Sequence, residues 1–437
     1  MDAALTPPAE VLKIARTLET AGFETWCVGG AVRDALLVGQ RHLDWDLATA
    51  AHPPQIRGLF ARTVPVGVEF GTVGVLDARG VMHEVTTFRR DVHTDGRHAV
   101  VEFGATLAED LARRDLTINA IAFSPSTGEM RDPFDGRGDL KRGIIRAVGE
   151  PGERLREDRL RALRAIRFAA RFGFAIDAAT WAAIVSSSPH LTRLSAERVK
   201  QEIDKTVEQV RLPGSAFKLW RESGSLGVLI PAMAGITDVQ LAALDQLRQP
   251  LPNAKPARKI ARLIALFSAA PPSEVPGILR GLRFSNSDVA WIASIVARWS
   301  ELQAEMRFAL TGKDAPGDGV LRRWAAIAGR TRLASVLRLA DAHWGAERAA
   351  GISAPSGRSV ASVYRRAVRI AYRDAVEVSD LAVNGRDLER IGITGPRVGK
   401  TLRSLLESVI YDPAINSPPT LLEMARKLAF DAQDQDG

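Results

Sequence analysis

The chain has 437 residues, of which 46% are hydrophobic and 25% are charged, as in a soluble globular protein of about three domains. Its 59 basic and 51 acidic residues leave a net charge of +8, which favours a polyanionic partner, although a charge of this size can also serve solubility alone. A single cysteine excludes an internal disulfide framework, no apolar run approaches the roughly 18 residues of a membrane span, and the acidic, proline-containing start is unlike a signal peptide, so we expect a cytoplasmic location.

Two glycines separate the first predicted strand from a helix. Apolar residues 26–28 predict a short buried strand, and residues 31–37 predict a helix. Because Gly29 and Gly30 have no Cβ, a phosphate can approach the backbone there, and the N-terminus of the following helix favours an anion. The turn is therefore a candidate nucleotide-binding element, although a lone Gly-Gly pair before a helix is usually only a turn.

A pair of carboxylates follows on the next predicted strand, residues 43–49. Side chains alternate across a strand, so Asp44 and Asp46 should share a face, where adjacent carboxylates repel one another. A divalent cation would relieve that repulsion, and Mg²⁺ is the first candidate because it prefers oxygen ligands. Such a pair alone is common on protein surfaces, so its interpretation depends on the glycine turn beside it.

The glycine turn, Arg33 in "GGAVRD" and the two aspartates together resemble the signature of the nucleotidyltransferase superfamily that includes DNA polymerase beta. They more closely resemble its branch of class II tRNA nucleotidyltransferases (CCA-adding enzymes) and bacterial poly(A) polymerases. The resemblance implies an α+β nucleotidyltransferase head with a small mixed sheet, followed by all-α neck, body and tail domains. It also implies two Mg²⁺ ions at Asp44 and Asp46, and nucleotide contacts from Gly29, Gly30 and Arg33.

Residues 71–77 and 81–88 predict the two strands of a hairpin, joined at "ARG". Glu84 on the second strand is the candidate third catalytic carboxylate. A buried acid on a central strand requires a partner, and the metal site of the two aspartates would supply one. The alternative is a glutamate that faces solvent on a half-exposed strand.

The segment "EDLARRDLTINAIAF", residues 109–123, resembles the sugar-reading motif of this family. On that resemblance Arg114, Asp115 and Asn119 are carried over as nucleotide contacts. An aspartate can accept hydrogen bonds from ribose hydroxyls, while an arginine or an asparagine holds triphosphate oxygens. Without the apolar residues that follow it, "RRD" is usually a surface ion pair.

Residues 157–174 predict one helix whose first turn carries a glutamate, an aspartate and an arginine. Glu157 and Asp158 lie four and three residues before Arg161, so the three side chains should cluster on one face. A carboxylate acceptor beside a guanidinium donor matches the edges of cytosine and adenine, whereas guanine and uracil would leave unpaired groups at about 1–3 kcal/mol each. The trio also resembles the family's EDxxR motif, in which Asp158 and Arg161 read the base and Glu157 orients Arg161. The alternative is an exposed salt bridge.

The chain is almost entirely helical beyond Pro151, with breaks at residues 211–215, 312–319 and 351–357. Residues 194–205 resemble the family's following motif, with Ser195 as a helix cap and Arg198 close to the neck. We expect four parts: a catalytic head at residues 1–145, a base-recognising neck at 146–215, a helical body at 216–350 and a tRNA-binding tail at 351–437.

A basic stripe is predicted on a helix of the tail. Arg365, Arg369 and Arg373 recur at four-residue spacing, so they share one helix face while apolar neighbours turn toward the core. The stripe is a candidate contact for the tRNA backbone, or only a solvated face.

The resemblance implies template-independent addition of CMP, CMP and AMP from CTP and ATP to the 3′ end of tRNA, with release of pyrophosphate. Full CCA addition is favoured for two reasons. The segment "VPVGVEFGTVGV" stands where poly(A) polymerases of this branch carry a basic segment, and residues 88–103 resemble the flexible loop that is absent from enzymes that add only cytidines. Addition of A alone, poly(A) synthesis and, from another class, a non-catalytic RNA-binding protein are the alternatives. The expected partners are tRNA, CTP and ATP, with no membrane and no obligate protein partner.

Overall fold

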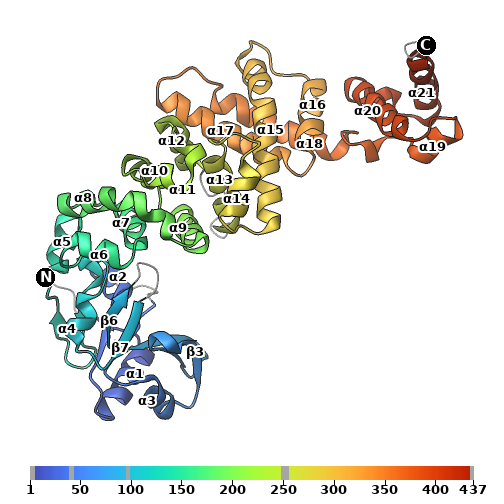
Figure 1. Ribbon diagram of the computed structural model, residues 1–437. Helices are drawn as coiled ribbons and strands as arrows, with labels where there is room; N and C mark the ends of the chain where they lie inside the picture. Colours follow the sequence, from blue (N-terminus) through green and yellow to red (C-terminus); the bar gives the residue numbers. More distant parts are fainter. Residues whose placement is uncertain (1–4, 39–43, 95–98, 248–254, 434–437) are drawn as a thin grey trace. The chain divides into compact units, whose positions relative to one another are not determined.

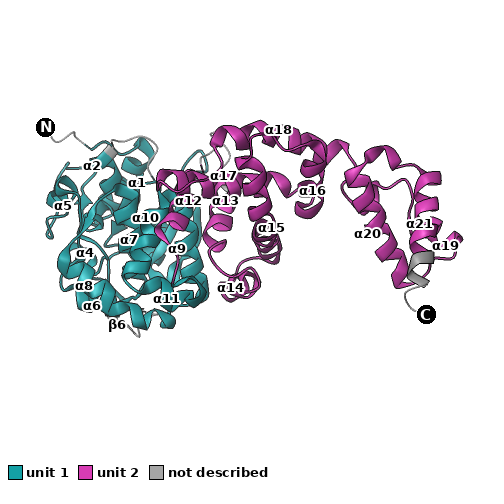
Figure 2. Cartoon of the chain, turned by 90° about the horizontal axis from the view of Figure 1, so that it is seen from above, with its two compact units in different colours: residues 1–234 teal, residues 235–437 magenta. Residues whose placement is uncertain are grey.

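The computed structural model describes residues 5–38, 44–94, 99–247 and 255–433, and Figure 1 labels its elements in chain order. These residues belong to two compact units, 1–234 and 235–437, which are coloured separately in Figure 2. Among the described residues, no helix is both long and apolar enough to cross a membrane. The finer division into head, neck, body and tail stays a prediction.

The first unit contains a seven-stranded mixed sheet in the order β3-β4-β5-β2-β1-β8-β9. Its strands are β1 (Thr25–Val28), β2 (Asp46–Thr49), β3 (Thr63–Gly67), β4 (Thr72–Leu76), β5 (Met82–Thr87), β8 (Ala122–Phe123) and β9 (Met130–Arg131). Strands β2 and β5 run parallel, and the other neighbouring strands of this sheet run antiparallel. The sheet confirms the expected α+β head. A separate antiparallel hairpin is formed by β6 (Arg89–Thr94) and β7 (Ala99–Phe103).

Local sequence explains the centre of this sheet. All four residues of β1 are buried, so both faces of the strand are covered, and its sequence does not alternate between apolar and polar residues. The predicted hairpin is confirmed by β4 and β5, whose turn is closed by Asp77: its Oδ1 accepts the backbone N–H groups of Arg79 and Val81, both at 2.8 Å. Gly80 in the same turn has a φ of +83°, a left-handed conformation that suits glycine.

Helices pack around the sheet and continue beyond it. Those of the first unit are α1 (Ala9–Thr20), α2 (Gly30–Val38), α3 (Pro53–Leu59), α4 (Leu107–Ala112), α5 (Gly136–Arg142), α6 (Pro151–Glu157), α7 (Leu160–Phe172), α8 (Ala178–Ser187), α9 (Ala196–Gln209), α10 (Pro213–Glu222) and α11 (Ser225–Leu229). Short 3₁₀ turns include η2 (Thr117–Asn119). The predicted helix at residues 31–37 is α2, and Ser195 is confirmed as the cap of α9, where its side chain accepts the backbone N–H of Arg198.

Two predicted elements differ from the structure. The strand predicted at residues 43–49 begins only at Asp46 among the described residues. The helix predicted at residues 157–174 is wrong as a single element: α6 ends at Glu157, Asp158 has extended backbone (φ −147°, ψ 106°), and α7 begins at Leu160. The part after Pro151 also contains β11 (Ala175–Ile176), which pairs in parallel with β10 (Ile144–Ile145).

The second unit is helical in all its described elements. These are α12 (Asp238–Gln246), α13 (Lys255–Phe267), α14 (Val275–Gly281), α15 (Asn286–Thr311), α16 (Asp318–Ala328), α17 (Leu333–Ala349), α18 (Gly357–Arg373), α19 (Gly385–Arg390), α20 (Pro396–Tyr411) and α21 (Pro418–Gln433). Trp324 and Trp344 are fully buried in its core. The predicted breaks at residues 211–215, 312–319 and 351–357 fall at or between helix ends, as expected for glycine- and proline-rich segments.

The start of α5 fixes the position of η2, and this contact gives a testable prediction. A Cβ on Gly136 would overlap the backbone carbonyl of Thr117. We expect Gly136→Ala to lower the free energy of unfolding by about 1–3 kcal/mol, because the backbone of η2 must move to admit the methyl group. Gly58→Ala in α3, where nothing lies within 4 Å of the added Cβ, is the matched control and should be neutral or stabilising. Equal urea-unfolding midpoints for the two variants would contradict this packing constraint.

Candidate active site

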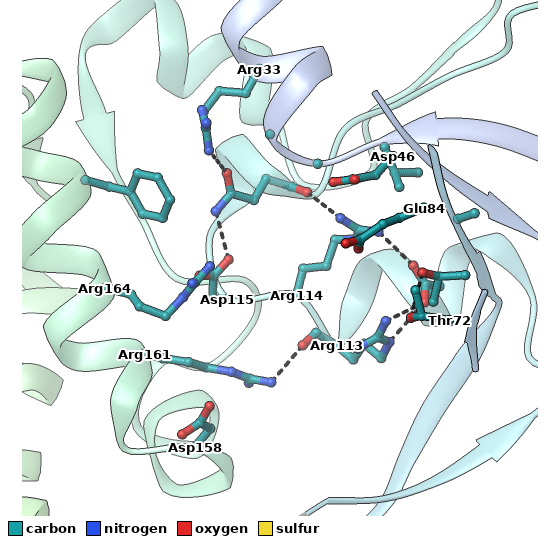
Figure 3. A pocket seen from close by; sticks show the side chains of 18 of the residues that line it. Arg33, Asp46, Thr72, Glu84, Arg113, Arg114, Asp115, Asp158, Arg161 and Arg164 are labelled. Atoms are coloured by element: carbon teal, nitrogen blue, oxygen red, sulfur yellow. Dashed lines mark hydrogen bonds and ion pairs between the residues drawn. The ribbon is translucent and has the colours of Figure 1, made fainter. Parts of the chain in front are cut away.

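A pocket of about 570 Å³ lies in the first unit, between the sheet and helices α7 and α9 (Figure 3). Ten of the residues predicted from the sequence line it: Gly29, Gly30, Arg33, Asp46, Glu84, Arg114, Asp115, Asn119, Asp158 and Arg161. Glu157 contacts Arg161, and Asp44 borders a neighbouring hollow. The fold therefore brings together motifs that are far apart in the chain.

Asp46 and Glu84 form the acidic wall of the pocket. Asp46 begins β2, and Glu84 lies on the adjacent parallel strand β5. Leu47 of β2 pairs with Val85 of β5, and each acid directly precedes its strand's member of that pair. Burial, and then the charge of Glu84, raise the pKa of Asp46 to about 6, although the positive charge of Arg114 lowers it. A proton or a cation is therefore favoured at this carboxylate.

Two details of the acidic wall correct the predictions. Asp44 is exposed and precedes β2, so of the two aspartates only Asp46 lies on the strand. Glu84 is exposed rather than buried, because its side of β5 borders open hollows instead of the core. Asp44, Asp46 and Glu84 nevertheless all border the neighbouring hollow of about 370 Å³.

The donor atoms suit a hard cation that arrives with its substrate. Within the described ranges, no three His, Cys, Asp or Glu side chains are arranged to hold a metal ion by themselves. Mg²⁺ commonly binds through one or two carboxylates, several waters and substrate phosphates rather than through a cage of protein ligands. The carboxylates of Asp44, Asp46 and Glu84 fit that mode of binding.

The glycine turn between β1 and α2 allows two arginines to approach the backbone. Gly29 has a φ of +74°, and a Cβ there would lie 2.9 Å from Nη1 of Arg114. A Cβ on Gly30 would lie 3.5 Å from Nη2 of Arg33. The turn thus combines positive side chains with the N-terminus of α2, an arrangement that favours an anion.

Asn119 connects α2 to the "RRD" motif. Its Oδ1 accepts a hydrogen bond from Nη1 of Arg33 (2.5 Å), and its Nδ2 donates to Oδ1 of Asp115 (2.9 Å). Asp115 also accepts a hydrogen bond from Nε of Arg164 (2.8 Å). Burial alone would raise the pKa of Asp115, but the charge of Arg164 and the hydrogen bond from Asn119 hold that pKa at about 2. Asp115 is therefore an ionised hydrogen-bond acceptor at neutral pH.

Helix α7 adds a row of four arginines to the pocket. Sequence reasoning identified the first of them and missed the other three. The row consists of Arg161, Arg164, Arg167 and Arg171, which all line the pocket. Their acidic partners are Glu157 (2.6 Å), Asp115 (2.8 Å), Glu202 (2.7 Å) and Asp34 (3.1 Å), respectively. The sequence signal was the spacing of three, three and four residues in "RALRAIRFAAR", which places arginines on one helix face.

The ring of Phe168 organises part of this positive wall. The guanidinium carbons of Arg33, Arg164 and Arg167 lie 4.9, 5.6 and 4.5 Å from its centroid. Cations are attracted to the face of an aromatic ring, so one side chain helps to hold three like charges close together. Such a concentration of guanidinium groups suits a polyanion such as a triphosphate.

The expected trio is arranged differently from three side chains on one helix face. Arg161 donates to Oε2 of Glu157 (2.6 Å) and to the backbone carbonyl of Arg113 (2.9 Å). Asp158 instead accepts a hydrogen bond from Arg198 (2.7 Å), because the extended backbone at this residue turns its side chain away from the helical pattern. The predicted cluster is thus confirmed for Glu157 with Arg161 and is wrong for Asp158. Asp158 and Arg161 still border the same pocket.

The predicted basic stripe lies on α18 in the second unit. Arg365, Arg369 and Arg373 are exposed, whereas Val363 and Ala367 are buried on the opposite side of the helix. Their spacing leaves the three arginines on one accessible face, but contact with RNA stays a prediction.

Two family models match this chain, one after the other along the sequence. Residues 25–146 match the poly A polymerase head domain, and residues 173–236 match the probable RNA and SrmB-binding site of polymerase A. The CCA-adding enzyme of Limosilactobacillus fermentum is 34% identical over 435 residues, which cover 97% of this chain and 98% of that protein. The CCA-adding enzyme of Lactiplantibacillus plantarum is 32% identical over 95% of each chain.

Solved structures extend the likeness to the fold. The crystal structure of the Bacillus stearothermophilus CCA-adding enzyme in complex with CTP is 34% identical, with a TM-score of 0.73 over 98% of this chain and 100% of that one. The Thermotoga maritima CCA-adding enzyme complexed with tRNA is 21% identical, has a TM-score of 0.64 and shares the fold over 95% of this chain and 94% of its own. Because relatives above 30% identity are matched over nearly their whole length, the chain belongs to the CCA-adding enzyme family of nucleotidyltransferases.

Proposed function

We propose that this protein is a CCA-adding tRNA nucleotidyltransferase, which adds CMP, CMP and AMP from CTP and ATP to the 3′ end of tRNA and releases pyrophosphate. The observation that carries the proposal is one pocket with an acidic wall, a row of arginines and the pair Asp158 and Arg161. Near full-length similarity to CCA-adding enzymes supports it. We place this reaction in the cytoplasm, where tRNA and nucleoside triphosphates occur together.

The acidic wall would carry the phosphoryl-transfer chemistry. Two Mg²⁺ ions, held by Asp44 and Asp46 with Glu84 beside them, would supply charge stabilisation and a more acidic 3′ hydroxyl. The arginines of α7 and Arg114 orient the triphosphate through charge-assisted hydrogen bonds. Arg33 and the glycine turn enclose the same anion. Asp115, held in its ionised form, accepts hydrogen bonds from the ribose, and Asn119 keeps its carboxylate in position.

Base selection rests on Asp158 and Arg161. An oxygen of a carboxylate has two lone pairs, so Asp158 can accept from a base amino group while it pairs with Arg198. Arg161, oriented by Glu157, donates to the ring nitrogen of cytosine or adenine. The acceptor-donor order of this pair disfavours guanine and uracil, whose edges carry the opposite order.

The defining experiment is nucleotide addition to defined tRNA ends. Purified protein is incubated with one tRNA transcript that ends before C74 and another that ends after C75, with each labelled NTP in turn. Addition of C, C and A to the first transcript supports full CCA addition. Addition of A only to the second would instead favour an A-adding enzyme, long A tails a poly(A) polymerase, and binding without extension a non-catalytic RNA-binding protein.

The first prediction of the proposed function concerns Asp46. Because the pKa of Asp46 is raised from 3.8 to about 6, its folded form binds the proton more tightly than its unfolded form, and this stabilisation is lost as the pH rises through about 6. Without divalent cations, Asp46→Asn should raise the free energy of unfolding at pH 8 by up to about 3 kcal/mol and change it little at pH 4. The same variant should abolish nucleotide incorporation with Mg²⁺ present.

Glu129→Gln, which alters an exposed acid paired with Arg131, is the control and should change neither property. Near-normal turnover in Asp46→Asn would remove Asp46 from the metal site. An unchanged stability at pH 8 would show that burial and Glu84 do not disfavour its charge.

The second prediction concerns base choice. Asp158→Ala and Arg161→Ala should each raise incorporation of UTP or GTP relative to CTP and ATP, because the paired acceptor and donor are lost. Arg156→Ala, an exposed position on α6, is the control and should leave the ratios unchanged. The measurement is kcat/KM for all four nucleotides on one tRNA. If neither Asp158→Ala nor Arg161→Ala changes the kcat/KM ratios among the four nucleotides, the motif has only a structural role as a salt bridge.

The third prediction concerns the stripe on α18. Charge reversal of Arg365, Arg369 and Arg373 should raise the apparent KM for tRNA and leave the KM for CTP unaltered, because the stripe meets the phosphate backbone. The log–log salt slope of tRNA binding should fall by roughly 0.7–0.9 for each contact removed. A salt titration that gives superimposable lines for the variant and the wild type would exclude this contact.

A further inference from the structure

Asp110 is a buried carboxylate that sequence reasoning left without a role. It lies in α4, its side chain is 1% exposed, and it borders the pocket. Its Oδ1 accepts from Nε (3.0 Å) and Nη2 (2.8 Å) of Arg113, and its Oδ2 accepts from Nη2 of Arg114 (3.0 Å). One carboxylate therefore holds two consecutive arginines just beyond the end of the helix.

Through Arg113 this carboxylate is connected to the base-reading side of the pocket. The backbone carbonyl of Arg113 accepts a hydrogen bond from Nη2 of Arg161 (2.9 Å), as Figure 3 shows. Glu157 fixes the other terminal nitrogen, Nη1, from α6. Arg161 is thus oriented by two groups: the side chain of Glu157 from α6 and the backbone carbonyl of Arg113, whose side chain Asp110 holds.

Through Arg114 the carboxylate of Asp110 is also connected to the glycine turn and the acidic wall of the pocket. Nη1 of Arg114 donates to the backbone carbonyl of Asn119 (3.2 Å) and lies 2.9 Å from the position that a Cβ on Gly29 would take. The charge of Arg114 also acts on Asp46. A single buried group therefore touches both the arginine beside the acidic wall and the residue that orients Arg161.

We propose that Asp110 is a positioning residue, which holds the backbone of Arg113 where its carbonyl orients Arg161 and thereby sets the choice of base. This inference rests on the proposed function, because it assigns base reading to Arg161. Asp110 itself is not placed in contact with the nucleotide. Its effect on selectivity passes through the Arg113 carbonyl, and its effect on triphosphate binding passes through Arg114.

A purely structural role makes a different prediction. If Asp110 only compensates the charge of two arginines, its removal should destabilise the protein without altering the ratio of nucleotides used. In Asp110→Asn the side chain keeps its shape, but an amide N–H now faces the N–H groups of Arg113 or Arg114, and donors cannot pair with donors. The backbone of Arg113 is then released together with the orientation of Arg161.

The test compares Asp110→Asn with Asp139→Asn. Asp139 is also 1% exposed and pairs with two arginines, Arg142 (2.8 Å) and Arg146 (3.2 Å), but it does not line the pocket. Both variants should lower the melting temperature. Only Asp110→Asn should reduce the preference for CTP over UTP, measured as the ratio of kcat/KM on one tRNA, by about tenfold or more, because small displacements of a positioning group have large effects on productive geometry.

A second variant keeps the test decisive if Asp110→Asn fails to fold. Arg113→Ala leaves Asp110 paired with Arg114 and removes a side chain that is 17% exposed, and it should reduce the same ratio in the same direction. Asp110→Glu, which preserves the charge, should restore part of the preference. A wild-type preference for CTP together with unchanged ratios in both Asp110→Asn and Arg113→Ala overturns the inference alone. If the wild type adds no CMP to tRNA, the proposed function itself fails.

Discussion

Carboxylate–guanidinium pairs across the pocket are the interaction on which this site depends. Asp34 of α2 and Asp115 beyond α4 pair with Arg171 and Arg164 of α7, so opposite charges join α7 to α2 and to the segment that follows α4. These side chains are partly buried, so removing one member of a pair leaves the other with less compensation from solvent than it would have at the surface. The same pairs keep several guanidinium groups close together, which their mutual repulsion would otherwise oppose.

The geometry of the pocket also depends on small and apolar residues that take no part in chemistry. Gly29 leaves space for Arg114 at the turn after β1, and the ring of Phe168 attracts three guanidinium groups. The opposite wall carries Asp46 and Glu84, whose mutual repulsion favours a cation. In the proposed function, a triphosphate with its metal ion would meet complementary charge on both sides, with its oxygens toward the arginines and the cation toward the acids.

The residues that we propose to read the base belong to this framework rather than to one helix. Arg161 is held by Glu157 from α6 and by the carbonyl of Arg113, while Asp158 is held by Arg198 from α9. Three segments therefore determine where the proposed donor and acceptor for the base lie. A protein that selects nucleotides without a template needs such rigidity, because discrimination depends on the direction of a few hydrogen bonds.

The sequence by itself determined the elements and motifs whose signals are local. The glycine turn, the β4–β5 hairpin, the helical cap at Ser195 and the pattern of short strands followed by helices are encoded within a few residues, and the predicted site residues include ten that line the pocket. Apart from the local pair of Glu157 and Arg161, tertiary structure decided which charges pair across the pocket. It separated Asp158 from Arg161 by ending α6 at Glu157, left Glu84 exposed, and gave Asp110 and three further arginines of α7 their places at the pocket. The contacts of Arg161 with Arg113, of Arg164 with Asp115 and of Arg198 with Asp158 join residues 40 or more positions apart, which meet only when the chain folds, so no local pattern contains them.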